Sequence, residues 1–470
     1  MIWWTIRQLN SSKPGARIVA ARKLGGAGQK RAVPALLRTL ADEDPLVRTA
    51  AAEALAKLPH PAAAEPLAAA LENAATSRMG KTETGVAEYK ALAEAIAAQG
   101  DGAVRPLTSL LSSQHKDARL WAAWAMGRIA SAELVPVLAG ALEDRRSDVR
   151  REAALALGAI ADRTALEPLL KAIANRDPET RRAAAEALAR FAHEKSLKAL
   201  EDATKDTDES VQRAAVASIA AMGTVAAALH LKAAVESDRK AVREDALAAL
   251  SAPELKPQEP DETAALAVLR GDTETALAQG EFAVPHLLDA MRSRDAARRL
   301  EAARALRQLK PFHAIPGFLR ALRDPELSVR EVATEALIEI GDPAVEGLVG
   351  AASSLDATVQ HFAATALGRI GNPAAAEALA GIIIRNRRTA AEYTEPLDAA
   401  RAAAYALHSV LRRNAASIAP ADLNRICEVP DVIVESASLT DPQLLVTETG
   451  IDCGPIRDLA RQEISRRLPS

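Results

Sequence analysis

The chain repeats one pattern of small and large apolar residues every 31 positions. The clearest run is marked by a polar residue that recurs at this interval: Arg119, Arg150, Arg181, Gln212 and Arg243. Each of them is followed at +3 by an alanine, at +4 usually by a second alanine, and at +7 by a large apolar residue. Apolar residues at these spacings lie on one face of an α-helix. A fixed period of this length predicts a solenoid, in which each unit packs only on its neighbours.

Residues 134–161 show the content of one unit. Pro136 stands where a first helical turn would begin, and proline is tolerated there because its missing N–H would be unpaired anyway. Apolar residues at helical spacing predict a first helix over 135–142 and a second over 149–160. The polar residues 144–148 between them predict a turn. Each unit is therefore predicted to be an antiparallel helix pair.

The repeat is interrupted at several places. Insertions at Asn73–Glu88 and Arg385–Pro396 fall in the turn between two helices, so we expect both at the same edge of the solenoid. Three prolines interrupt the pattern at Pro253–Glu262 and precede a poor unit at Thr263–Gly280. We predict four parts, namely amino-terminal repeats at 1–252, a break with a degenerate repeat at 253–282, further repeats at 283–411, and a non-repeat tail at 412–470.

The tail carries β-branched residues and turn formers, and Ile456–Leu468 predicts a closing helix. The last repeat of a solenoid has to be covered, so we interpret the tail as a cap. A separate functional appendage is the alternative.

The recurrent arginine is interpreted first as a structural element. An aspartate often stands six positions before it, as Asp144 does before Arg150 and Asp324 before Arg330. The rigid fork of a guanidinium can bridge a carboxylate or carbonyl in the turn of its own unit and in the next unit. Direct contact with a ligand is the alternative.

This pattern resembles the HEAT-like repeat family, in the short variety named after the phycobilisome bilin lyases. The resemblance rests on the 31-residue unit, the early proline, the Asp/Arg spacing and the Ala-Ala-x-Ala-Leu second helix, and it covers about Met1 to Leu411. It implies an all-α fold, an α-α superhelix of about a dozen helix pairs with an atypical carboxy-terminal cap. Members of the family include scaffolds, chromophore lyases, DNA glycosylases and a metal-dependent hydroxylase. The hydroxylase uses several His-Glu pairs, and this chain has one, His193-Glu194, so we exclude that activity.

The composition limits the class of partner that the chain can bind and the cell compartment in which we expect it. Aromatic residues make up only 3% of the chain, and the formal net charge of −3 argues against a general nucleic-acid binder. The cysteines, Cys427 and Cys453, form no disulfide framework or CxxC pair, and we find no signal-peptide pattern and no apolar run of membrane-spanning length. We therefore expect a cytoplasmic protein with no cofactor and no membrane partner, and leave its oligomeric state open.

Side chains beside the recurrent arginine form the candidate binding face. Positions +1 and +5 face away from the predicted core, and in such solenoids the second helices usually line the concave surface. This face carries Arg151, Arg182 and Arg213 in successive units, preceded by Trp121, Trp124 and Tyr89. Arginine and large aromatic residues are frequent at binding hot spots. The alternatives are a solvated arginine face and tryptophans that fill a gap under the first insertion.

We predict a non-enzymatic scaffold that binds a protein segment on this face. An acidic or phosphorylated peptide with an aromatic or apolar anchor would suit it. Further along, Glu331 and Glu335 make the face acidic, which favours a protein over a uniform polyanion. A DNA glycosylase-type repair protein and a bilin-lyase-like cofactor chaperone remain the alternatives. No nucleophile–base pair, phosphate loop or metal cluster is visible in the sequence.

Overall fold

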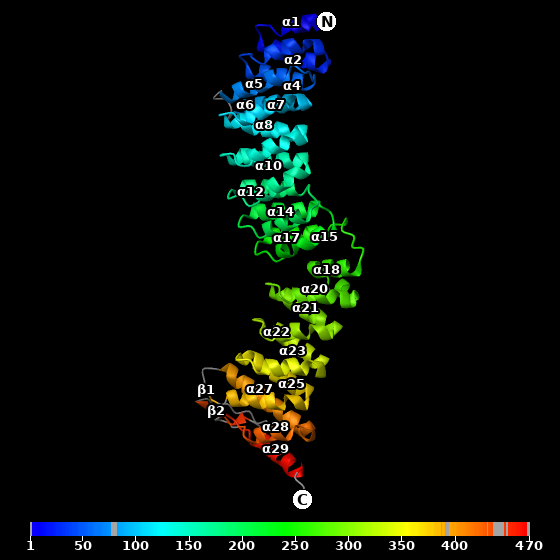
Figure 1. Ribbon diagram of the computed structural model, residues 1–470, viewed down its shortest axis with the longest axis vertical. Helices are drawn as coiled ribbons and strands as arrows, with labels where there is room; N and C mark the ends of the chain where they lie inside the picture. The colour runs from blue at the N-terminus through cyan, green and yellow to red at the C-terminus, as the bar shows by residue number, and fades with distance from the viewer. Residues whose placement is uncertain are drawn as a thin grey trace. The chain divides into compact units, whose positions relative to one another are not determined.

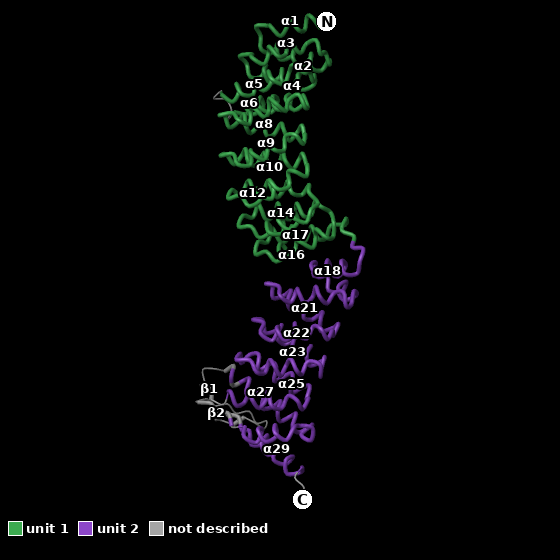
Figure 2. Tube along the Cα trace, in the orientation of Figure 1, with its two compact units in different colours: residues 1–256 green, residues 257–470 purple. Residues whose placement is uncertain are grey.

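The computed structural model describes residues 2–76, 82–386, 388–390, 394–429, 431–435, 446–447 and 450–467. The chain forms two compact units, unit 1 at Met1–Lys256 and unit 2 at Pro257–Ser470 (Figure 2). The division between them falls inside the proline-containing segment Pro253–Glu262. Each unit is described by itself.

Unit 1 is a stack of helix pairs (Figure 1). Its first helices are α1 (Ile2–Gln8), α3 (Val33–Thr39), α5 (Ala64–Thr76), α7 (Val104–Leu111), α9 (Val135–Ala141), α11 (Leu166–Ala172) and α13 (Glu194–Ala203), with α15 (Val225–Ala228) and α16 (Lys232–Val235) in the last pair. Its second helices are α2 (Pro14–Gly26), α4 (Pro45–Ala56), α6 (Glu83–Ala97), α8 (Lys116–Ile129), α10 (Ser147–Ile160), α12 (Pro178–Leu188), α14 (Glu209–Ala221) and α17 (Lys240–Leu250). Short 3₁₀ helices introduce several pairs: η1 (Lys30–Ala32), η3 (Gly100–Ala103), η4 (Ala132–Leu134), η5 (Arg163–Ala165) and η6 (Leu229–Leu231).

Unit 2 continues the same architecture after α17. The degenerate repeat forms a helix pair, α18 (Pro260–Arg270) and α19 (Thr273–Ala278). The pairs that follow are α20 (Ala283–Ala290) with α21 (Ala296–Leu309), α22 (Ile315–Ala321) with α23 (Leu327–Ile340), α24 (Val345–Ala352) with α25 (Ala357–Ile370), and α26 (Ala376–Arg385) with α27 (Thr394–Asn414). Their 3₁₀ helices are η7 (Gly280–Phe282), η8 (Phe312–Ala314), η9 (Asp342–Ala344) and η10 (Pro373–Ala375). The prediction of an all-α solenoid is confirmed.

Turn residues start the second helices. Asp177 accepts a hydrogen bond from the backbone N–H of Thr180 at the start of α12, and Asp208 caps α14 in the same way. Proline occupies the first position of α4 and α12, where no N–H is needed. Because these residues satisfy the exposed N–H groups of each helix, the polar stretch between two helices fixes where the second one begins.

Neighbouring second helices pack backbone to backbone. A Cβ added at Gly158 would lie 2.8 Å from the Cα of Ala187, and one added at Gly127 would lie 2.9 Å from the Cα of Ala156. These alanines and the large apolar residues of the repeat are fully buried. The repeated small residues therefore set the spacing between units.

The recurrent arginine joins one repeat to the next, as predicted. Its guanidinium donates to a backbone carbonyl in its own turn and to the aspartate in the turn of the following unit. Arg119, for example, donates to the carbonyl of Ser113 at 2.9 Å and to both carboxylate oxygens of Asp144 at 2.7 and 3.1 Å. Arg181 contacts Asp206 in the same way. We call this series of contacts the arginine ladder.

The ladder aspartate Asp144 serves two arginines through different atoms. The carboxylate of Asp144 accepts from Arg119 of the preceding unit, while its backbone carbonyl accepts from Arg150 of its own unit at 2.8 Å. The spacing of six residues in the sequence therefore reflects the carbonyl contact. The carboxylate contact spans 25 residues.

The first insertion is shorter than predicted. We expected the second helix to begin near Tyr89, but α5 extends to Thr76 and α6 already begins at Glu83. The hydroxyl oxygen of Thr82 caps α6 by accepting from the N–H of Gly85, which explains the earlier start. The rest of the insertion, residues 77–81, lies outside the described residues.

The second insertion takes part in a small sheet with the tail. The strands are β1 (Arg388–Ala390), β2 (Val432–Glu435), β3 (Val446–Thr447) and β4 (Gly450–Ile451), in the order β1-β2-β4-β3. β1 pairs parallel to β2, with Thr389 opposite Val434, and the other pairings are antiparallel. The remaining residues of this insertion, 387 and 391–393, lie outside the described part.

The tail also covers the last helix pair. After η11 (Ala415–Ser417), α28 (Pro420–Cys427) packs on α26, and α29 (Gly454–Arg467) packs on α27 and α28. Leu423, Ile426 and Ile456 are fully buried there. The predicted closing helix is thus present, and it lies over the apolar face of the last repeat.

Candidate functional site

A cluster of aromatic side chains lies on α6 and α8 of unit 1. The rings of Trp121 and Trp124 meet edge to face, with centroids 5.6 Å apart. The guanidinium of Arg128, one turn further along α8, lies over the ring of Trp124 at 5.2 Å. Both tryptophans are partly exposed and Arg128 is exposed. We call Trp121, Trp124 and Arg128 the aromatic cluster.

Tyr89 lies beneath this cluster and not on the surface. Its side chain is only 2% exposed, its ring stacks on Trp121 at 6.4 Å, and its hydroxyl donates to the carbonyl of Ala74 at 3.1 Å. Burial raises the pKa of Tyr89 to about 12, with further contributions from Asp117 and Glu88. Tyr89 therefore stays neutral and supports Trp121 from below, without an exposed surface for a partner.

The burial pattern of α6 explains this position. Glu88 and Tyr89 are buried like Ala118 and Arg119 of α8, so Tyr89 occupies the place of the recurrent arginine. Glu88 then replaces the turn aspartate and accepts two hydrogen bonds from Arg48, at 2.5 and 2.9 Å. The arginine ladder is thus continued here by different residues.

The predicted arginine row lies on α10, α12 and α14, and each of its members has a carboxylate beside it. Arg182 contacts Glu179 and Glu186 of its own helix, at 3.0 and 2.7 Å. Arg213 contacts Asp245 of α17 at 2.6 Å. The row therefore presents little uncompensated positive charge.

Arg151 is the member with the weakest compensation. Its closest carboxylate, Glu152, is 4.0 Å away, and its Nε is buried with no hydrogen-bond partner within the protein. Burial raises the pKa of Glu152, and the charge of Arg151 only partly opposes this. Because α10 packs directly on α8, Arg151 belongs to the repeat next to the aromatic cluster.

Sequence reasoning missed Arg128. Arg128 follows Trp124 by four residues, which places the two on one face of a helix, so the spacing could have indicated the contact. Glu152 and Glu186 lie close enough in the sequence to pair with the arginine row, and the structure shows both contacts.

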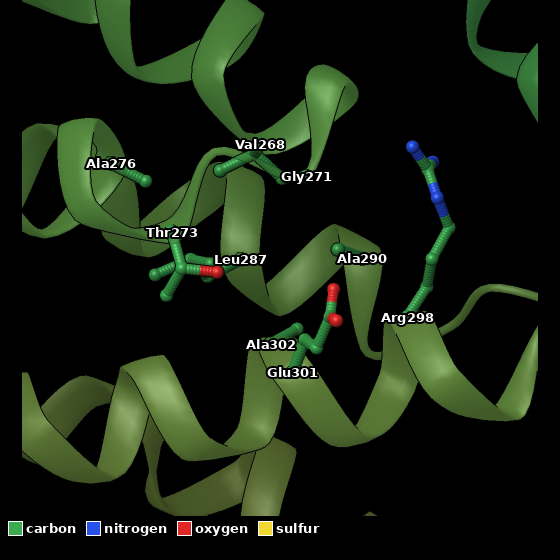
Figure 3. Close-up of a pocket in the computed structure, with 9 residues that line it drawn as sticks. All are labelled: Val268, Gly271, Thr273, Ala276, Leu287, Ala290, Arg298, Glu301 and Ala302. Atoms are coloured by element: carbon green, nitrogen blue, oxygen red, sulfur yellow. The ribbon is translucent and has the colours of Figure 1, made fainter.

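Two cavities lie elsewhere. An open groove of about 550 Å³ in unit 1 is lined by α3, α4 and α5 and the turn residue Asp42, with Arg48 and Asn73 among its polar side chains. A pocket of about 30 Å³ in unit 2 lies between α18, α19, α20 and α21 (Figure 3). In that view Glu301 points from α21 towards Ala290 of α20. A volume this small holds little more than water.

The described residues contain no group of three or more His, Cys, Asp or Glu side chains placed to hold a metal ion. Among the described helices, none is both long and apolar enough to cross a membrane.

Comparisons with solved structures give general likenesses. An engineered protein is 24% identical, with 79% of this chain and 99% of that chain covered and a TM-score of 0.30. Kap95p, in a structure describing its binding to RanGDP, is 14% identical, with 91% and 70% covered and a TM-score of 0.41. Human deoxyhypusine hydroxylase in complex with glycerol is 23% identical, with 47% and 83% covered and a TM-score of 0.25. A search of curated proteins found no match.

A family model described as HEAT repeats matches residues 4–80, 104–177, 166–251, 284–354 and 315–407. These matches cover well over half of the chain and both of its units. Together with the stacked helix pairs and the arginine ladder, they show that the chain belongs to the HEAT repeat family.

Proposed function

We propose that the chain is a non-enzymatic scaffold that binds a segment of a partner protein on the exposed side of its second helices. The observation that carries this proposal is the aromatic cluster on α8. Tryptophan and arginine are the residues most enriched at binding hot spots, and this chain has only four tryptophans. Because Tyr89 holds Trp121 from below, the cluster is ordered before a partner arrives, and less entropy is lost on binding.

The partner segment is proposed to carry an apolar or aromatic anchor and one nearby carboxylate or phosphate. The anchor would pack on Trp121 and Trp124, and the anionic group would bind the exposed part of the Arg151 guanidinium, whose closest carboxylate, Glu152, is 4.0 Å away. Arg182 and Arg213 already contact carboxylates of the chain, so a long polyanion would have to displace these contacts. This charge pattern supports a protein segment over DNA.

The other two alternatives gain no support from the described residues. A glycosylase that cradles DNA would use uncompensated basic side chains, and the arginine row is largely paired. A tetrapyrrole carrier would need a large apolar pocket beside the tryptophans, and neither cavity described above includes them.

The repeat length and the ladder further support membership of the short, phycobilisome lyase-type variety of HEAT repeats, as a proposal about ancestry and not about activity. The two cysteines are free thiols, which supports a reducing compartment such as the cytoplasm.

Selection of peptides from a random display library on the immobilised full chain tests the proposal. Bound peptides are counter-selected on the Trp121→Ala/Trp124→Ala variant, so that only binders of the aromatic cluster remain. We expect recovered peptides to share an apolar or aromatic residue next to an acidic one. Their Kd should rise about 30-fold or more on Trp124→Ala and about tenfold on Arg151→Glu.

A matched control is Phe282→Ala/Phe312→Ala, which removes two exposed aromatic side chains from unit 2. This control should bind the peptides like the wild type. If the recovered peptides bind the Trp121→Ala/Trp124→Ala variant with unchanged Kd, while circular dichroism shows that the variant is folded, the proposal is wrong.

A further inference from the structure

Helix α1 exposes two consecutive tryptophans. Trp3 is 72% exposed and Trp4 is 61% exposed. Among the other described aromatic side chains, only Phe312, at 66%, is comparably exposed. Arg7 lies over the ring of Trp3 at 5.8 Å. No described element of the chain covers these rings. Exposed tryptophans side by side are unusual in a chain whose other two tryptophans are partly buried.

The same part of the chain is strongly basic. Residues 1–41 contain eight Lys and Arg residues and no Asp or Glu, although the whole chain has a net charge of −3. Arg17 and Arg22 pair with Asp42 and Glu53 of the next repeat. The structure gives no ion pair to the other six residues within its described part: Arg7, Lys13, Lys23, Lys30, Arg31 and Arg38.

The fold brings part of this charge to the tryptophans. α1 packs on α2, and η1 follows the end of α2 after three residues, so the tryptophans and this part of the charge belong to adjacent elements (Figure 1). Lys23 stands near the end of α2, and Lys30 and Arg31 follow in η1. All three side chains are exposed. We call Trp3, Trp4, Lys23, Lys30 and Arg31 the basic tryptophan patch.

We propose that the basic tryptophan patch binds the surface of an anionic lipid membrane. Indole rings favour the headgroup level of a bilayer, and Lys and Arg side chains are attracted to anionic lipids. Neither of the two cavities described above includes residues of the patch, and both indoles are largely exposed. Lipids can rearrange around such side chains, whereas a folded protein would need a complementary shape.

This contact would be peripheral, because no described helix is suited to cross a membrane. It differs from the expectation that the chain has no membrane partner, which considered only spanning segments and a signal peptide. The patch is also separate from the aromatic cluster on α8, so the membrane proposal and the partner-binding proposal stand or fall independently.

Vesicle binding by the full chain tests the proposal. Vesicles are made either of phosphatidylcholine alone or of equal parts of phosphatidylcholine and phosphatidylserine, and bound protein is measured by co-sedimentation. Trp121→Phe/Trp124→Phe serves as the background, so that Trp3 and Trp4 are the only tryptophan emitters. We expect binding to the phosphatidylserine vesicles, with a blue shift of tryptophan emission and weaker binding as salt rises.

Two variants of this background measure the parts of the patch. Lys23→Gln/Lys30→Gln/Arg31→Gln should weaken partitioning about 100-fold, since each basic residue near an anionic surface contributes about a factor of five. Trp3→Ala/Trp4→Ala should weaken it by about tenfold or more. The charge control is Arg176→Gln/Lys198→Gln/Lys205→Gln, which removes three exposed basic residues elsewhere in unit 1 and should bind nearly as well as its parent.

The proposal is overturned if the phosphatidylserine vesicles bind no more protein than the phosphatidylcholine vesicles. It is also overturned if the charge control loses as much binding as the glutamine variant of the patch. A third refuting result is that the protein binds duplex DNA or poly-glutamate in preference to the vesicles, while the emission of Trp3 and Trp4 does not shift. Should Trp3→Ala/Trp4→Ala fail to fold, the glutamine variant of the patch gives the same decision, because it changes only exposed side chains.

Discussion

Replacing Arg119 by methionine should remove one step of the arginine ladder and leave the apolar part of the side chain in place. Arg119 and Asp144 are almost fully buried, with 6% and 13% of their side chains exposed. The substitution removes two hydrogen bonds to Asp144 and two to the carbonyls of Ser113 and Gln114. It therefore weakens both the turn of one repeat and its contact with the next.

The expected cost follows from what remains after the substitution. Removing one partner of a buried ion pair costs about 3–5 kcal/mol, because the other charge is left without compensation. Asp144 would keep the hydrogen bond from the N–H of Arg146 at 2.8 Å and would regain some contact with water. We therefore expect the lower end, a loss of about 3 kcal/mol in the free energy of unfolding. Lys171→Met is the exposed control, since Lys171 and Glu143 are 78% and 64% exposed and the pair contributes about 0–1 kcal/mol.

Urea unfolding followed by tryptophan fluorescence measures this cost locally. In a Trp3→Phe/Trp4→Phe background, only Trp121 and Trp124 of α8 emit, and α8 is the helix that carries Arg119. Circular dichroism of the same samples reports the remaining helices. Because repeats are stabilised by their neighbours, we expect the fluorescence transition to move to lower urea than the dichroism transition.

A loss below about 1 kcal/mol, or no larger than that of Lys171→Met, would refute the role given to the ladder. The double variant Arg119→Met/Asp144→Asn gives a second check. It should be more stable than Arg119→Met alone, because the uncompensated carboxylate is gone.

Three further predictions concern packing, acid stability and a thiol. Gly158→Ala should lower the free energy of unfolding in urea by about 1–3 kcal/mol, because the added methyl group meets backbone atoms of α12. The control Gly140→Ala meets no other atoms and should raise it by about 0.5–1 kcal/mol. Equal effects of the two variants would contradict the close contact between α10 and α12. Burial tends to raise the pKa of Asp206, but hydrogen bonds from Arg181 lower it below its usual value. The carboxylate therefore stabilises the fold fully above about pH 4, and this stabilisation is lost as pH falls through the lowered pKa. Asp206→Asn should flatten the dependence of the free energy of unfolding on pH below about 4, and an unchanged slope would argue against this role of Asp206. Burial raises the pKa of the Cys453 thiol to about 12, so a thiol reagent should label Cys427 well before Cys453 in the folded protein, and simultaneous labelling would show that the tail does not cover the last repeat.

The sequence by itself determined the repeat, its helix pairs and the structural role of the recurrent arginine. These follow from local information, since each unit contacts only its neighbours and the same residue types return at the same positions. The prediction of a carboxylate or carbonyl contact for Arg119 is confirmed for this reason. The aromatic residues and the arginine row were recognised as departures from the repeat, and their role in binding stays a proposal.

Only the tertiary structure decided which partner each of these side chains has. It buried Tyr89 at a ladder position, because α6 begins at Glu83 and Tyr89 stands where other second helices carry the recurrent arginine. It also placed a carboxylate beside each member of the arginine row, and joined β1 to β2 across more than 40 residues of sequence. Such contacts depend on the distance and burial between elements that the chain brings together in space. A periodic pattern fixes which face a residue occupies, but the charge and exposure of that face depend on side chains from neighbouring units.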